Sequence, residues 1–178
     1  MSALDPLLIL RTLAEHGVDA VVIGQAAAVL HGHPETTVDV DVLVSLELSN
    51  TERLAEALHQ LGARHAGSDA EPDERDFVVG LRQMLAFDTT AGRVDVLPAA
   101  SGLGGYDDVA PRAITVDLGG FTVLVATLDD VIASKEAAGR PKDLRRLDSL
   151  RALRRLAEER NTAELISPPD QDGPSPAS

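Results

Sequence analysis

The chain has 178 residues, of which 44% are hydrophobic and 25% charged, a composition that excludes a disordered polymer. Its 29 Asp and Glu residues outnumber its 16 Lys and Arg residues, and the formal net charge of -13 opposes general binding to DNA or RNA. The absence of cysteine excludes disulfides, thiolate metal sites and cysteine nucleophiles, and is compatible with the cytoplasm. No stretch approaches the roughly 20 apolar residues of a membrane span, so we expect no membrane association.

The first half of the chain shows helical and extended patterns in turn. Apolar spacing predicts helices over residues 6–16, 25–30 and 49–62 and strands over 18–23 and 38–44. Gly24 separates the first strand from the second helix, and we expect Asn50 or Thr51 to cap the third helix. A polar loop is predicted over residues 67–75.

The second half contains four further predicted strands and two further helices. The strands are expected over residues 77–87, 93–97, 114–117 and 121–125, and the helices over 127–138 and 141–160. Gly119-Gly120 predicts a hairpin between the last two strands, and Thr127 with Asp130 predicts a helix start close to a capping box.

These elements predict an α+β fold with a mixed sheet flanked by helices. We expect a single domain over residues 1–166, with a helical C-terminal part at about 127–160 and a disordered tail over 167–178.

Two of the predicted strands place carboxylates on one face. In residues 38–44 the valines alternate with Asp39 and Asp41, and in 93–97 Asp95 stands between Val94 and Val96. If these strands are neighbours, three carboxylates converge and repel one another by roughly 3 kcal/mol per close pair. A divalent cation or a retained proton would relieve this, and oxygen ligands favour Mg²⁺ or Mn²⁺. The alternative is that these aspartates are solvent-facing positions in an acidic chain.

Gly24 ends a strand and begins a helix, which directs free backbone N–H groups beyond the strand, where a phosphate would fit. A tight turn without a ligand is the simpler interpretation of a lone glycine. His31 and His33, beside the acidic strand, leave a zinc site as another alternative to solvated loop histidines.

Four segments in order resemble the polymerase-beta-type nucleotidyltransferases, and more narrowly the small AbiEii- and MNT-like enzymes often encoded in toxin–antitoxin pairs. The matching segments are VVIGQAAAVLHG at 21–32, TTVDVDVLV at 36–44, RVDVLP at 93–98 and ATLDDVIASKEAAGRPKDLRRL at 126–147.

This resemblance implies transfer of a nucleoside monophosphate from an NTP to an acceptor hydroxyl, with release of pyrophosphate. Asp39, Asp41 and Asp95 would be the catalytic residues and the ligands of Mg²⁺ or Mn²⁺. Gly24 and Gln25 would cradle the phosphates. Three cationic side chains would reach the triphosphate: Lys135, Arg140 and Lys142. The implied acceptor is RNA (a tRNA end) or a protein, and an antitoxin is an implied partner.

Two positions depart from the family pattern. Relatives usually carry Gly-Ser or Gly-Gly where this chain has Gly24-Gln25, and many have arginine where it has Glu35. Both changes weaken the expected contacts to an NTP. A catalytically inactive domain that binds nucleotide or a partner is therefore the second hypothesis.

Charge is distributed unevenly along the chain. Residues 135–160 contain nine basic and five acidic side chains, a local +4, which leaves -17 for the remainder. This segment could face a triphosphate, an RNA end or an acidic partner. Alternatively it is a helix with internal ion pairs such as Asp148 with Arg151.

Overall fold

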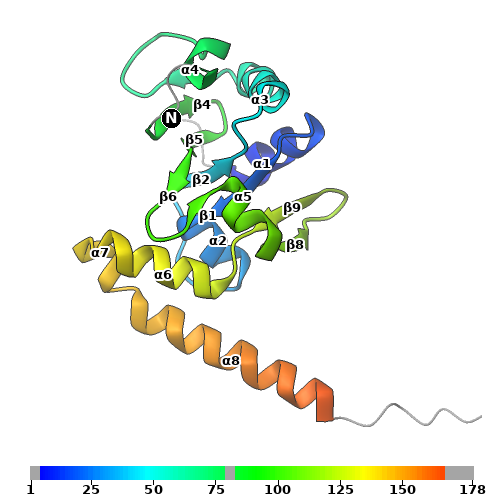
Figure 1. Ribbon diagram of the computed structural model, residues 1–178, viewed down its shortest axis with the longest axis vertical. Coiled ribbons are helices and arrows are strands. Elements are labelled where there is room, and N and C mark those ends of the chain that lie inside the picture. The colour runs from blue at the N-terminus through cyan, green and yellow to red at the C-terminus, as the bar shows by residue number, and fades with distance from the viewer. Residues whose placement is uncertain (1–4, 79–82, 167–178) are drawn as a thin grey trace, which may run out of the picture.

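The computed structural model describes residues 5–78 and 83–166, whose centre is a seven-stranded mixed sheet with the order β3-β4-β5-β2-β1-β9-β8 (Figure 1). Its strands are β1 (Ala20–Ile23), β2 (Asp39–Val44), β3 (Arg64–His65), β4 (Leu85–Thr89), β5 (Gly92–Leu97), β8 (Ile114–Asp117) and β9 (Thr122–Val125). A separate pair is formed by β6 (Ala99–Ala100) and β7 (Gly104–Gly105). β2 runs parallel to β5 and antiparallel to β1, so the predicted α+β class with a mixed sheet is confirmed.

Helices cover the sheet on both faces. They are α1 (Pro6–Glu15), α2 (Gly24–Leu30), α3 (Leu48–Gln60), α4 (Glu74–Val78), α5 (Tyr106–Val109), the 3-10 turn η1 (Ala110–Arg112), α6 (Leu128–Ala138), α7 (Pro141–Leu144) and α8 (Leu147–Ile166). α1 contacts α3, β2 and β5, whereas α2 contacts β2 and α6. α8 packs along α6, at the end of the molecule away from α3 and α4 (Figure 1).

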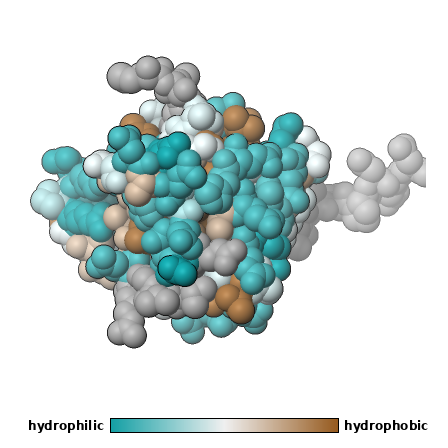
Figure 2. Space-filling model, turned by 90° about the horizontal axis from the view of Figure 1, so that it is seen from above, coloured by the Kyte–Doolittle hydropathy of each residue, from teal (hydrophilic) through white to brown (hydrophobic). Residues whose placement is uncertain are grey.

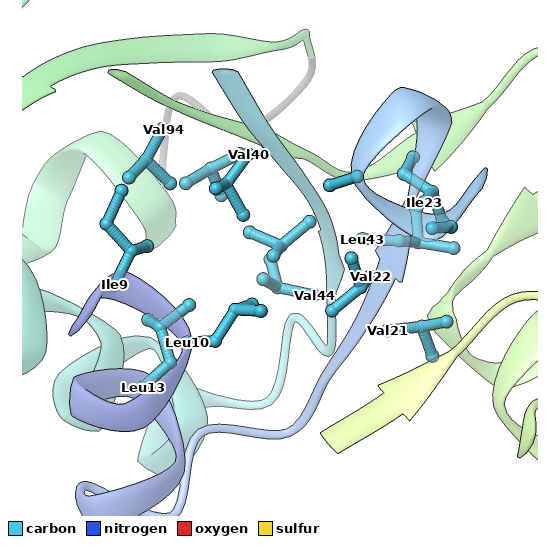
Figure 3. Packing of buried hydrophobic residues seen from close by; sticks show 14 of the residues in the cluster. Ile9, Leu10, Leu13, Val21, Val22, Ile23, Val40, Leu43, Val44 and Val94 are labelled. Atoms are coloured by element: carbon cyan, nitrogen blue, oxygen red, sulfur yellow. The ribbon is translucent and has the colours of Figure 1, made fainter. Parts of the chain in front are cut away.

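The alternation along β2 separates an apolar face from a carboxylate face. Val40, Val42 and Val44 are fully buried, and the helix α1 packs Ile9 and Leu10 over this region (Figure 3). Burial of an aliphatic side chain of this size stabilises a fold by about 1.5–3 kcal/mol. The apolar face therefore anchors β2, while Asp39 and Asp41, at alternate positions, stay partly exposed.

The surface is largely hydrophilic at the end of the molecule that Figure 2 shows, where hydrophobic side chains form only small separate spots. Within the two described ranges, no helix combines the length and apolar character that crossing a membrane requires.

Two local predictions are confirmed by side-chain and backbone contacts. β8 and β9 form the antiparallel hairpin predicted from Gly119-Gly120. The Thr127 hydroxyl accepts a hydrogen bond from the backbone N–H of Asp130 at 3.1 Å, which caps α6 as predicted.

Three predicted elements are corrected. Phe77 lies in the short helix α4 and not in a strand over 77–87; a buried aromatic residue suits either element, and the strand begins only at Leu85. Residues 79–82 of that prediction, and the tail at 167–178, lie outside the described residues. α3 begins at Leu48 after Glu47, because the Asn50 side chain bonds Asp19 and Ser45 instead of capping the helix.

The long helix predicted over 141–160 is also wrong, since α7 and α8 are separate. Arg145 and Arg146 break the helix, and Leu144 is 49% exposed while Asp143 is buried. The leucine pattern places Leu144 in an apolar stripe. In the structure Asp143 pairs with Lys135 of α6, so that Asp143 and not Leu144 faces the interior.

Candidate functional site

Asp39, Asp41 and Asp95 lie on the same face of the sheet, on adjacent strands. Asp41 on β2 is the direct register partner of Asp95 on β5, and Asp39 is the partner of Arg93. Asp95 is 7% exposed, and Asp41 is partly buried. The predicted neighbourhood of the two Val-Asp strands is therefore present, although the catalytic roles of these aspartates stay predictions.

Gly24 stands directly against the Asp41 carboxylate. Its φ of +63° lies in the left-handed region that favours glycine, and a Cβ placed there would be 2.4 Å from Asp41 Oδ2. In the β1–β2 register, Ile23 is the partner of Asp41, which explains the close approach. Glycine is thus required both by the backbone and by the carboxylate beside it.

Asp41 is the electrostatic centre of this group. Burial, and after it the negative charges of Asp39 and Asp95, raise the pKa of Asp41 from 3.8 to about 7. Lys135 and Lys142 act in the opposite direction. A carboxylate that is costly to ionise and flanked by two others favours a bound cation.

Arg93 is a member of the site that the sequence patterns did not indicate. Its Nε donates to Asp95 Oδ1 at 2.9 Å, and this hydrogen bond, together with the charges of Asp88 and Asp39, raises the pKa of Arg93. An arginine two residues before an aspartate in a strand shares its face, so the period of two could have indicated the contact.

The three cationic candidates differ in their surroundings. Lys135 is buried, at 7% exposure, and its Nζ lies 3.2 Å from Asp143 Oδ1. Lys142 is exposed yet acts on the charge of Asp41. Arg140 is exposed at the start of α7. Asp143 is therefore a further residue of this region that the sequence patterns missed.

Gln25 faces the interior, where its Nε2 lies 3.2 Å from His33 Nδ1 and its Oε1 is buried without a partner among the described residues. His33 Nε2 in turn lies 2.9 Å from Ser149 Oγ, while His31 Nε2 contacts the carbonyl of Ala126 at 2.8 Å. The two imidazoles thus serve different partners and do not form the zinc site considered from the sequence. The side-chain amide nitrogen of Gln25 thus directs one of its two N–H groups to His33.

Glu35, the position expected to weaken NTP binding, is held by a basic residue. Arg146 Nε lies 2.6 Å from Glu35 Oε2. Arg146 lies between α7 and α8, so a guanidinium group reaches this loop from there, although position 35 itself is not an arginine. Its positive charge offsets that of Glu35.

Part of the basic segment 135–160 is paired across helices. Arg151 bonds Glu136 of α6 at 2.6 Å, and Arg154 bonds Asp129 of α6 at 2.9 Å. The predicted pair of Arg151 with Asp148 is present at 3.6 Å. These contacts dock α8 on α6 and reduce the free positive charge.

The donor set fits a hard divalent cation. Among the residues that the structure describes, no three acidic or histidine side chains form a ready-made metal cage. Mg²⁺ is usually held by one or two carboxylates together with substrate phosphates, and paired carboxylates at Asp41 and Asp95 suit that pattern. A cavity of about 290 Å³ lies elsewhere, between the end of α1 and the start of β1, and none of the three aspartates lines it.

Comparisons with known proteins identify the family and the fold. The family model described as nucleotidyltransferase of unknown function (DUF6036) matches residues 8–157. The fold is similar to that of the antibiotic-resistance factor ANT(2'')-Ia in a solution structure, with a TM-score of 0.52, 15% identity and coverage of 89% of this chain and 91% of that chain. The crystal structure of ANT(2'')-Ia in complex with adenylyl-2''-tobramycin gives a TM-score of 0.52 and 15% identity, covering 88% and 96%. No curated protein matches the chain.

Proposed function

This chain belongs to the family of nucleotidyltransferases of unknown function, and on that premise we propose that it transfers a nucleoside monophosphate from an NTP to an acceptor hydroxyl. The observation that carries the proposal is the pairing of Asp41 with Asp95 across parallel strands, with Gly24 packed against Asp41. Paired carboxylates that are at least partly buried, beside a glycine turn, suit a triphosphate and its metal ions better than they suit a purely structural face.

Asp39 and Asp41 are proposed to hold Mg²⁺ or Mn²⁺, with Asp95 completing the ligand set. When bound, these ions would offset the negative charge on the triphosphate and on the attacking and leaving oxygens. Gly24 lets the backbone lie directly against the Asp41 carboxylate, and Lys142 provides an exposed cation that acts on this carboxylate.

The proposed reaction forms one bond and breaks one. The acceptor oxygen attacks the α-phosphorus, the bond from that phosphorus to the oxygen bridging to the β-phosphate breaks, and pyrophosphate leaves with the electron pair. The hydroxyl proton passes toward Asp95. Arg93, two residues earlier in the same strand, holds this carboxylate in place by a hydrogen bond. Lys135 is proposed to act on the site through its positive charge, which lowers the pKa of Asp41, while its ammonium group stays bound to Asp143.

The acceptor is proposed to be an RNA end, as in tRNA, or a protein, and the chain to be an AbiEii- or MNT-like toxin that an antitoxin partner controls in the cytoplasm. Exposed Arg140, Lys142 and Arg145 support an anionic acceptor. The fold similarity to ANT(2'')-Ia adds an aminoglycoside hydroxyl as a competing acceptor class.

The experiment incubates the full chain with each α-labelled NTP and Mg²⁺ or Mn²⁺, in parallel with total tRNA, with cell lysate and with tobramycin. The proposal predicts a labelled acceptor that depends on wild-type protein and disappears with Asp39→Ala. Equal labelling by Asp39→Ala, or no label in any reaction, would remove it.

A second candidate is a catalytically silent domain that binds a nucleotide or a partner. It is favoured by two observations: the Gln25 side chain is buried and bonded to His33, and Arg93 already pairs with Asp95. This candidate predicts no transfer to any acceptor by the wild-type protein. Turnover that is lost on Asp95→Asn would exclude it.

A further inference from the structure

A line of polar contacts connects α2 to α8 through His33. Gln25 Nε2 lies 3.2 Å from His33 Nδ1, and His33 Nε2 lies 2.9 Å from Ser149 Oγ. The Ser149 hydroxyl in turn donates to the carbonyl of Arg146 at 2.8 Å. Gln25 and His33 are 7% and 4% exposed, so water competes little for the bond between these two side chains. None of the proposed chemistry of transfer uses this line.

One neutral tautomer of His33 satisfies every contact in the line. The backbone N–H of Glu35 also points at His33 Nδ1, at 3.4 Å, so Nδ1 faces two donors and acts as the acceptor. The proton therefore sits on Nε2 and is donated to Ser149. Burial lowers the pKa of His33, as do the charges of Arg146 and Lys135, while Glu35 opposes them. His33 is thus a neutral imidazole that accepts hydrogen bonds at Nδ1 and donates one from Nε2.

Two members of the line, Gln25 and His33, lie close in sequence to residues of the candidate site. Gln25 directly follows Gly24, where the carboxylate of Asp41 fills the place of a side chain. The loop that contains His33 leads into β2 at Asp39, and Arg146 holds Glu35 in the same loop. A displacement of α8 would therefore be transmitted to the glycine turn and to the start of β2.

We propose that His33 is a positioning residue that fixes the Gly24 turn against Asp41 by joining Gln25 to Ser149 on α8. The catalytic consequence rests on the proposed function, whereas the structural consequence does not. α8 is thereby part of the site although it contributes no group to the carboxylate cluster.

The test measures amide hydrogen exchange over residues 24–30 in the full chain. Ser149→Ala is the main variant, because Ser149 is exposed and its loss leaves the core intact. We expect Ser149→Ala and His33→Leu each to accelerate exchange over 24–30 roughly fivefold, the factor for one ordinary hydrogen bond. The double variant should exchange no faster than His33→Leu, and His33→Gln, which keeps a donor for Ser149, should recover much of the protection.

A matched control is His16→Leu. His16 also bonds a glutamine, with Nε2 2.8 Å from Gln60 Oε1, but between α1 and α3. Exchange over 24–30 should not change in this variant. If Ser149→Ala exchanges over 24–30 at the wild-type rate, the positioning role is overturned.

Transfer kinetics provide the second readout. A positioning role predicts that Ser149→Ala lowers kcat by about fivefold while KM for the NTP changes less, since the turn is misplaced more in the reacting geometry than in binding. Faster exchange over 24–30 without transfer by the wild-type protein supports the positioning role and rejects the proposed function. Transfer by the wild-type protein, together with unchanged exchange over 24–30 in Ser149→Ala, supports the proposed function and rejects the positioning role.

Discussion

Asp41 and Asp95 lie side by side as register partners on the parallel strands β2 and β5. The Asp41 carboxylate is so close to Gly24 that position 24 has no room for a Cβ atom. Two neighbouring carboxylates in a partly buried place oppose folding unless a cation offsets them. The chain supplies Arg93, Lys135 and Lys142 around this pair, which compensate only in part, because the pKa of Asp41 stays near 7. Retained electrostatic cost of this kind is typical of functional sites.

Asp41→Asn should stabilise the protein in the absence of metal. A rise in pKa from 3.8 to about 7 corresponds to at most about 4 kcal/mol of unfolding free energy, and solvent screening reduces this to about 1–3 kcal/mol. Because the folded protein binds the proton more tightly, the free energy of unfolding of the wild type falls as the pH rises from about 4 to 7. Urea unfolding with EDTA should therefore show the variant to be more stable at pH 8, with the difference shrinking toward pH 4.

Asp69→Asn is the control for this prediction, since Asp69 is exposed and far along the chain in a surface loop. It should leave the unfolding free energy unchanged within about 0.5 kcal/mol. A pH-independent difference between the wild type and Asp41→Asn would contradict the electrostatic account.

Gly24→Ala should be more damaging than the same change at another glycine of positive φ. The new Cβ would meet Asp41 Oδ2 at 2.4 Å, whereas a Cβ at Gly67, with φ of +78°, meets no atom within 4 Å. Gly67→Ala should therefore cost only the backbone strain, about 1 kcal/mol, and Gly24→Ala at least about 1 kcal/mol more. Denaturant unfolding compares the two, and equal losses would show that Asp41 moves aside freely.

Lys135→Met should unfold the protein far more readily than Lys142→Met. Lys135 forms a buried pair with Asp143, and removing one partner of such a pair typically costs about 3–5 kcal/mol. Lys142 is exposed, so its replacement should change the unfolding free energy by less than about 0.5 kcal/mol while weakening NTP binding.

The double variant Lys135→Met/Asp143→Leu checks the cause. It should recover much of the stability lost by Lys135→Met, because no unpaired buried charge remains. Stability as low as that of the single variant would mean that Lys135 acts through packing and not through its charge.

Mg²⁺ with an NTP should raise the melting temperature of the wild type. A ligand at 100 times its Kd stabilises the native state by about 2.7 kcal/mol if it does not bind the unfolded chain. Asp41→Asn and Asp95→Asn should show no such increase, and EDTA should abolish it in the wild type. A melting temperature that millimolar Mg²⁺ and NTP leave unchanged would favour the silent domain.

The strands of the site were predictable because their signal is local. Alternation of valine and aspartate predicts which face of its strand each of Asp39, Asp41 and Asp95 occupies, whereas the pairing of the two strands was only a condition of the prediction. The hairpin at Gly119-Gly120 and the cap at Thr127 likewise depend on residues a few positions apart.

What the sequence did not reveal depends on partners distant along the chain. The buried pair of Lys135 with Asp143, which joins α6 to α7, left no signal in the sequence, and neither did the separation of α7 from α8. The Gln25 side chain bonds His33 in the interior, and Glu35 pairs with Arg146, which lies 111 positions later in the chain. Such cross-chain pairs leave no periodic signal, so they require the fold.

The most direct test of the central claim is nucleotidyl transfer by wild type and Asp41→Asn, measured with α-labelled NTPs, Mg²⁺ and the acceptor that labels best. Asp41→Asn is suited to this comparison because it should remain folded, and circular dichroism verifies that. The account predicts labelled acceptor and released pyrophosphate with the wild type and a loss of at least about 10²-fold in the variant. Transfer at the wild-type rate by folded Asp41→Asn would contradict it.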